Sequence, residues 1–108
     1  MIPQIHPEQL AQRLRSGEPV YLLDVRQPWE YDICRLPGSV LIPLPELTGR
    51  LEEVQPNEDA LVVVYCHHGI RSLSGASILL QAGFGEVASL AGGIDAWSAL
   101  VGPTGPKY

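Results

Sequence analysis

Basic charge and long apolar runs are both scarce in this sequence. Lysine occurs only at Lys107, and 7 Lys and Arg residues against 12 Asp and Glu residues give a formal net charge of -5. Because no run of basic residues is present, we do not expect binding to nucleic acid through phosphate contacts. The longest apolar run, Ala60 to Tyr65, is far shorter than the roughly 20 residues of a membrane-spanning helix. The composition therefore predicts neither nucleic acid nor a membrane as a partner.

Cysteine is equally scarce, since Cys34 and Cys66 are the two residues of this type. They are too few for a disulfide framework or a four-cysteine zinc site, and their spacing is not C-x-x-C. Free thiols indicate a reducing compartment. The segment from Met1 to His6 lacks the basic and apolar regions of a secretory signal, so we expect a cytoplasmic protein. The sequence gives no reason to expect a metal or another cofactor.

The length of 108 residues, with 45% apolar residues, suits one domain with its own core. Residues 101–108 contain two prolines and two glycines and carry no helical or strand pattern. We therefore expect a domain over residues 1–100 and a surface tail over residues 101–108.

The fold class follows from short β-branched runs that alternate with helical patterns, which is typical of βαβ units. We expect an α/β fold whose sheet has five mostly parallel strands. The expected strands are Ile2–Ile5, Val20–Val25, Val40–Ile42, Leu61–Tyr65 and Val87–Leu90. The expected helices are Pro7–Arg15, Pro28–Ile33, Pro45 to just before Pro56, Ser72–Gln81 and Ile94–Leu100.

The connection after the fourth strand carries the strongest chemical signal. Cys66 follows directly on the most apolar of the expected strands. A compact loop then leads through Gly69 and Arg71 into the expected helix with the clearest apolar face. Loop amides and the helix dipole give a thiol at this place two physical reasons to ionise, and Arg71 adds a third. The pattern predicts an anion-binding site built around a nucleophile, although a cysteine that simply ends a buried strand is the alternative.

Several motifs occur in an order and at spacings that resemble the single-domain rhodanese family. They are Asp24-Val25-Arg26 followed by Glu30-Tyr31, Leu36-Pro37-Gly38-Ser39, Cys66-His67-His68-Gly69-Ile70-Arg71-Ser72 and Gly92-Gly93-Ile94-Asp95-Ala96-Trp97. The resemblance covers residues 20 to 98. It implies a three-layer α/β/α sulfurtransferase fold in which Cys66 carries sulfane sulfur as a persulfide.

The resemblance also implies a double displacement at Cys66. Its thiolate attacks the outer sulfur of thiosulfate or a persulfide donor, and cyanide, a thiol or a protein then accepts the sulfur. Cys66 is the expected catalytic residue, and the expected substrate-binding residues are His67, His68, Gly69, Ile70, Arg71 and Ser72. We expect small-molecule donors and acceptors, with a protein acceptor left open, and a monomer or weak dimer.

Individual side chains near this loop leave alternatives open. Arg71 either orients the donor's sulfonate or is a structural arginine paired with an acid. Adjacent histidines on a tight loop usually point apart, so we expect His67 and His68 to shape the pocket rim rather than to chelate a metal.

Residues outside the loop are expected to be structural. Asp24 and Arg26 should tie neighbouring loops together, with Asp24 finding a cationic partner. Trp29 and Trp97 should be packing residues. Cys34, where the family more often has glycine, is expected toward the opposite edge of the sheet from Cys66, as an inert thiol.

Two other functions compete with sulfur transfer. A cysteine phosphatase or arsenate reductase also uses a Cys-to-Arg loop, but the tyrosine-phosphatase pattern has five intervening residues and this sequence has four. The other alternative is a sulfur-carrier or docking module that serves a partner protein.

Overall fold

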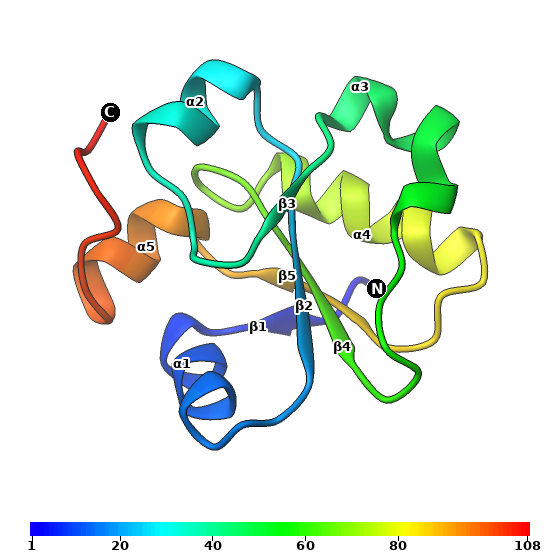
Figure 1. Cartoon of the computed structure of the whole chain (residues 1–108), viewed down its shortest axis with the longest axis horizontal. Coiled ribbons are helices and arrows are strands. Elements are labelled where there is room, and N and C mark those ends of the chain that lie inside the picture. Colours follow the sequence, from blue (N-terminus) through cyan, green and yellow to red (C-terminus); the bar gives the residue numbers. More distant parts are fainter.

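The computed structural model of the chain describes residues 1–108 and contains one five-stranded sheet (Figure 1). Its strand order is β1-β5-β4-β2-β3, and every neighbouring pair is parallel. The strands are β1 (Gln4–Ile5), β2 (Val20–Asp24), β3 (Val40–Leu41), β4 (Leu61–Tyr65) and β5 (Val87–Leu90). The expected α/β fold with a parallel sheet is confirmed.

Helices cover both faces of this sheet. They are α1 (Pro7–Arg15), α2 (Pro28–Ile33), α3 (Leu44–Leu47), α4 (Arg71–Gln81), α5 (Gly93–Leu100) and the 3₁₀ helix η1 (Thr48–Glu53). In Figure 1, α1 and α5 lie on one side of the strands, and α3 and α4 lie on the other. Alternate residues of β4 serve two separate cores, since Val63 packs in one cluster while Val62 and Val64 pack in the other.

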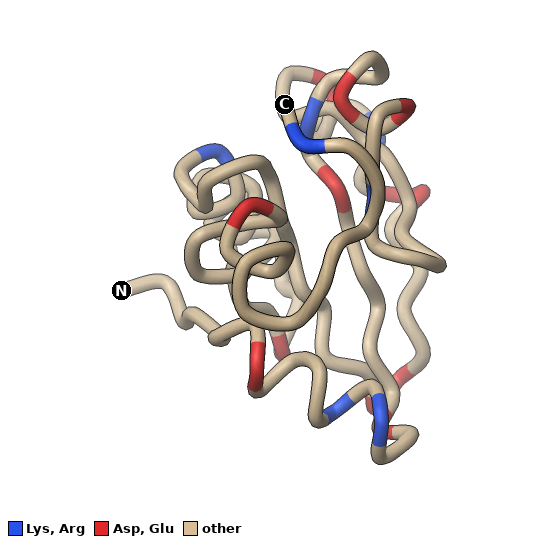
Figure 2. The backbone as a smooth tube through the Cα atoms, turned by 90° about the vertical axis from the view of Figure 1, so that its left-hand side faces the viewer, with Lys and Arg blue, Asp and Glu red and all other residues tan.

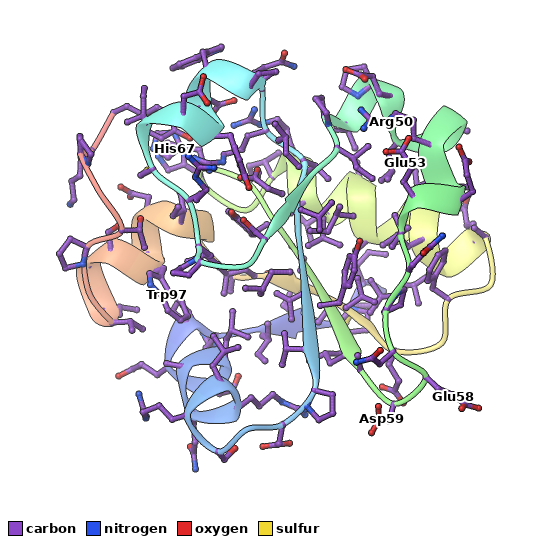
Figure 3. All side chains as sticks on the ribbon, viewed as in Figure 1. Arg50, Glu53, Glu58, Asp59, His67 and Trp97 are labelled. Carbon is purple, nitrogen blue, oxygen red and sulfur yellow. The ribbon has the colours of Figure 1, made fainter.

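The helix expected from Pro45 to Pro56 is not continuous. It is divided into α3 and η1, and Arg50 has non-helical angles of φ -130° and ψ 25°. Gly49 weakens a helix at this point because it has the largest backbone entropy to lose. Arg50 then donates hydrogen bonds of 2.8 Å to Glu46 and to Glu53, and Figure 3 shows Arg50 beside Glu53.

The topology brings the loops after β2 and β4 together. β2 leads outward to β3 at one edge, whereas β4 leads to β5 and the half of the sheet that ends in β1. Asp24 pairs in register with Tyr65, so both strands end at the same level. The chain thus leaves β2 and β4, which are neighbours, toward opposite halves of the sheet. Ligands of open parallel sheets bind in the crevice at such a position, beyond the carboxyl ends of the strands.

Charged positions are scattered over the backbone, and several of both signs lie near the end marked C in Figure 2. None of the helices combines the length and the apolar character that a membrane crossing requires.

Candidate active site

Cys66 lies immediately after β4, at the N-terminus of α4, and is only 1% exposed. The backbone N–H groups of Gly69 and Ser72 donate to its Sγ at 3.2 and 3.3 Å, and the thiol donates to Ser72 Oγ at 3.5 Å. Ser72 Oγ is in turn 2.7 Å from the hydroxyl of Ser89 on β5. Two backbone amides therefore converge on the sulfur, that of Gly69 in the loop and that of Ser72 in the first turn of α4, and a negatively charged sulfur would be stabilised by both.

The N-terminus of α5 is hydrogen-bonded to the backbone of the Cys66 loop, residues 66–71. Ile94 N–H donates to Cys66 O at 2.9 Å, and Asp95 N–H donates to His67 O at 3.1 Å. Gly93 lies so close to this loop that a Cβ built on it would be 2.3 Å from His67 O. Glycine is thus required at Gly93 because its backbone touches the backbone of the loop, whereas a Cβ on Gly92 would meet Ala96 of α5.

Substituting Gly93 by alanine should displace the Cys66 loop and destabilise the fold. Gly93 has φ +64°, and Gly17 has a similar φ of +76° but no atom within 4 Å of an added Cβ. Gly17→Ala therefore measures the backbone strain alone, while Gly93→Ala adds the steric conflict. We expect urea unfolding to show a loss for Gly93→Ala that exceeds the loss for Gly17→Ala by about 1 to 3 kcal/mol. Equal losses in the two variants would show that the loop can move away without penalty.

Arg71, the first residue of α4, is paired with Glu30 of α2. Its Nη1 and Nη2 donate to the two carboxylate oxygens of Glu30 at 2.7 and 2.9 Å. The Arg71 side chain is still 37% exposed, whereas that of Glu30 is 4% exposed. The hydrogen bonds that Arg71 donates to Glu30 raise the pKa of Arg71, so its charge is retained. The acidic partner expected for a structural arginine is present, and the remaining exposed part of Arg71 faces solvent.

The Glu30 carboxylate should make stability depend on acid pH. Burial alone would raise the pKa of Glu30, but hydrogen bonds from Arg71, the Gln27 amide and Tyr108 outweigh it and lower the pKa to about 2. Because the unfolded chain takes up this proton near pH 4.5 and the folded chain does not, folding stability falls as pH drops through this window.

We expect wild type to lose about 2 to 3 kcal/mol more than Glu30→Gln between about pH 6 and pH 2.5, as measured by urea unfolding. Glu58→Gln is the matched control, because Glu58 is exposed at the opposite end of the molecule (Figure 3). Its acid dependence should follow wild type. A Glu30→Gln profile parallel to wild type would contradict the assignment of this carboxylate.

His67 and His68 do not point apart as the sequence suggested. Their rings stack with centroids 3.9 Å apart, and the opposite face of His67 stacks on Tyr108 at 4.0 Å. Burial lowers the pKa of His67, and the neighbouring His68 lowers it further, which favours the neutral imidazole. Asp95 completes a group of three potential metal ligands, with its carboxylate 4.0 Å from His68 Nε2. Stacked imidazoles direct their nitrogen lone pairs side by side rather than toward one point, which disfavours chelation.

Asp24 and Arg26 form the buried ion pair that the sequence indicated. Both side chains are 0% exposed, and Arg26 Nη2 is hydrogen-bonded to Asp24. Arg26 Nη2 also donates to Cys34 O at 2.7 Å. The expectation that Cys34 lies at the opposite edge of the sheet is wrong, because Cys34 and His67 border the same small pocket. α2 is short, so the chain has not descended far when it reaches Cys34; the two cysteines are nevertheless free and belong to different core clusters.

The two tryptophans differ in their environment. Trp97 is 9% exposed and packs in the core, as expected. Trp29 is 58% exposed, so its prediction as a packing residue is wrong; it makes an edge-on contact with Tyr108, with ring centroids 5.6 Å apart.

Sequence reasoning also missed two side chains that contact predicted site residues. Glu30 belongs to a recognised motif, but nothing in its position indicates a bond to Arg71, 41 residues away. Tyr108, whose hydroxyl lies 2.8 Å from both Arg26 Nη1 and Glu30 Oε2, stands in a segment without any pattern. No sequence signal available in one chain would have identified it.

Comparison with known proteins gives a consistent result. A family model described as the rhodanese-like domain matches residues 6–100. The chain is 37% identical over 109 residues to a protein named Sulfurtransferase from Allochromatium vinosum, covering 97% of this chain and 100% of that protein. It is 35% identical over 97 residues to the Putative sulfur carrier protein YrkF of Bacillus subtilis, covering 90% of this chain and 51% of that protein. The crystal structure of a thiosulfate sulfurtransferase from Pseudomonas aeruginosa matches with a TM-score of 0.85 and 30% identity, covering 94% of this chain and 20% of that one.

Proposed function

The chain belongs to the rhodanese-like family of sulfurtransferases, and we propose that it moves sulfane sulfur from thiosulfate or a persulfide donor to a thiophilic acceptor through a persulfide on Cys66. The observation that carries this proposal is the pair of amide hydrogen bonds, from Gly69 and Ser72, to the sulfur of a cysteine at the N-terminus of α4. A nucleophilic thiolate needs such stabilisation, and these two amides would supply it.

In the proposed first half-reaction, the Cys66 thiolate attacks the outer sulfur of thiosulfate. A new S–S bond forms, the S–S bond of thiosulfate breaks, and sulfite leaves with that bonding pair. The acceptor then attacks the outer sulfur of the persulfide, and the Cys66 thiolate is released. Loop amides that face the sulfur would stabilise the negative charge of the intermediate.

The loop side chains would divide the substrate-binding role. Arg71 would contribute positive charge to the anionic end of the donor through its exposed part, while Glu30 fixes its orientation. His67 and His68 would form the rim that an acceptor meets, since His68 is 63% exposed. Ile70 is 74% exposed and would lie at the same rim, where a protein acceptor would make contact.

The proposal extends to the location of the protein, its oligomeric state and its acceptor. Free cysteines persist in the reducing cytoplasm, where we place the reaction, with small-molecule donors and acceptors and a protein that is a monomer or a weak dimer. A protein acceptor agrees with the sulfur-carrier name of the B. subtilis relative.

Intact-mass analysis after brief incubation with thiosulfate tests the proposal. We expect wild type to gain the mass of one sulfur atom and to lose it to cyanide as thiocyanate. A protein that gains no sulfur from thiosulfate or from glutathione persulfide, yet hydrolyses an aryl phosphate, would overturn the proposal in favour of a phosphatase.

A further inference from the structure

Residues 101–108 turn back along α5 and end beside α2, close to the Cys66 loop (Figure 1). The segment is held against the end of α2 at Gly105, where an added Cβ would lie 3.0 Å from Ile33 O and 3.1 Å from Cys34 Cβ. This close approach places the Tyr108 ring on His67, with centroids 4.0 Å apart. The segment thereby supplies one side of the candidate active site, although it lies outside the residues that match the family model.

The Tyr108 hydroxyl connects two ion pairs. It accepts a hydrogen bond from Arg26 Nη1 at 2.8 Å and donates one to Glu30 Oε2 at 2.8 Å. Arg26 is anchored by Asp24, and the same Glu30 oxygen also receives a bond from Arg71. Because Arg26 is 0% exposed and Glu30 is 3% exposed, the hydroxyl joins a fully buried cation to the carboxylate that pairs with Arg71.

We propose that Tyr108 is a positioning residue for the sulfur-donor step: it holds Glu30, and through Glu30 the Arg71 guanidinium, in the orientation that receives the anionic end of the donor. The inference rests on the proposed function and names a residue outside the loop that the donor would contact. Burial raises the pKa of Tyr108 to about 12, so the hydroxyl remains a donor to Glu30 over the physiological range. Loss of this bond removes the connection of Glu30 Oε2 to Arg26 and leaves Glu30 held by the Gln27 amide and by Arg71 alone, which loosens the orientation of the Glu30–Arg71 pair.

Steady-state kinetics of Tyr108→Phe, with thiosulfate and cyanide varied separately, test this role. Phenylalanine keeps the ring on His67 and removes only the hydroxyl. We expect the KM for thiosulfate to rise about tenfold, the equivalent of one hydrogen bond to a charged group. The KM for cyanide should stay within about twofold, since a ligand this small needs no arginine to orient it. A merely structural role would lower the amount of folded enzyme and leave both KM values unchanged.

Gly105 offers a second route that leaves Tyr108 intact. Gly105→Val should push the segment away from Ile33 and Cys34 and reproduce the higher KM for thiosulfate. Gly102→Val is its matched control, because Gly102 also has a positive φ, +159° against +138° at Gly105, but no atom lies within 4 Å of an added Cβ there. We expect this control to keep the wild-type KM values. A raised thiosulfate KM in Gly102→Val equal to that in Gly105→Val would overturn the specific role of Tyr108.

Binding without turnover separates this inference from the proposed function. Calorimetry of thiosulfate with Cys66→Ala, with and without Tyr108→Phe, measures donor affinity in a protein that cannot react. We expect the double variant to bind about tenfold more weakly. Equal affinities, together with an unchanged thiosulfate KM in active Tyr108→Phe, would overturn the role of Tyr108 and leave the proposed function intact. If wild type forms no thiocyanate with thiosulfate or with glutathione persulfide, the proposed function itself would be overturned.

Discussion

Replacing Cys66 by serine is expected to reduce thiocyanate formation from thiosulfate and cyanide by at least about 10³-fold, the scale of loss when a covalent nucleophile is removed. A serine hydroxyl at this place can still accept hydrogen bonds from the Gly69 and Ser72 amides, so the loop should keep its shape. The hydroxyl is far less nucleophilic than a thiolate and forms no persulfide. Thiocyanate assays and intact mass therefore both report the chemistry rather than the fold.

Cys34 provides the matched control for this experiment. It is buried and free like Cys66, but its Sγ lies 4.0 Å from Arg26 Nη1 and receives no backbone amide. We expect Cys34→Ser to form the persulfide and to retain activity within about threefold of wild type, in line with the absence of stabilising amides. Sulfur that is found on Cys34 and lost in Cys34→Ser would instead identify Cys34 as the nucleophile.

The sequence allows the sheet and the Cys66 loop to be predicted because both depend on local patterns. The runs at Leu61–Tyr65 and Val87–Leu90 are continuous and apolar, as strands covered on both faces must be. Gly69 in the Cys66 loop has φ +93°, a backbone conformation that favours glycine. Each of these features is fixed by residues within a few positions of one another.

The remainder of the site depends on contacts between distant segments, which one sequence does not encode in a readable form. Tyr108 meets Glu30 across 78 residues and Arg26 across 82 residues. His67 stacks on both His68 and Tyr108, so its orientation depends in part on a residue 41 positions away in the last segment. The same argument applies to Cys34, whose position depends on where the short α2 ends.

Removing Arg26 should cause a large loss of folding stability. Arg26 Nε and Nη2 donate to the Asp24 carboxylate at 2.9 and 2.6 Å, and both side chains are 0% exposed. In Arg26→Met the aspartate stays buried without its cation, which typically costs 3 to 5 kcal/mol, roughly half of the stability of a small domain. Urea unfolding at neutral pH should show a loss of about 3 to 5 kcal/mol.

A double-mutant cycle identifies the cause of this loss. Asp24→Leu combined with Arg26→Met removes both charges, so the double variant should be more stable than Arg26→Met alone. Arg50→Met serves as the exposed control, because Arg50 also pairs with two carboxylates but its side chain is 34% exposed. That control should lose no more than about 1 kcal/mol, since exposed ion pairs contribute little. If Arg26→Met lost no more unfolding free energy than Arg50→Met, the buried Asp24–Arg26 pair would not be what holds the end of β2 against the end of α2.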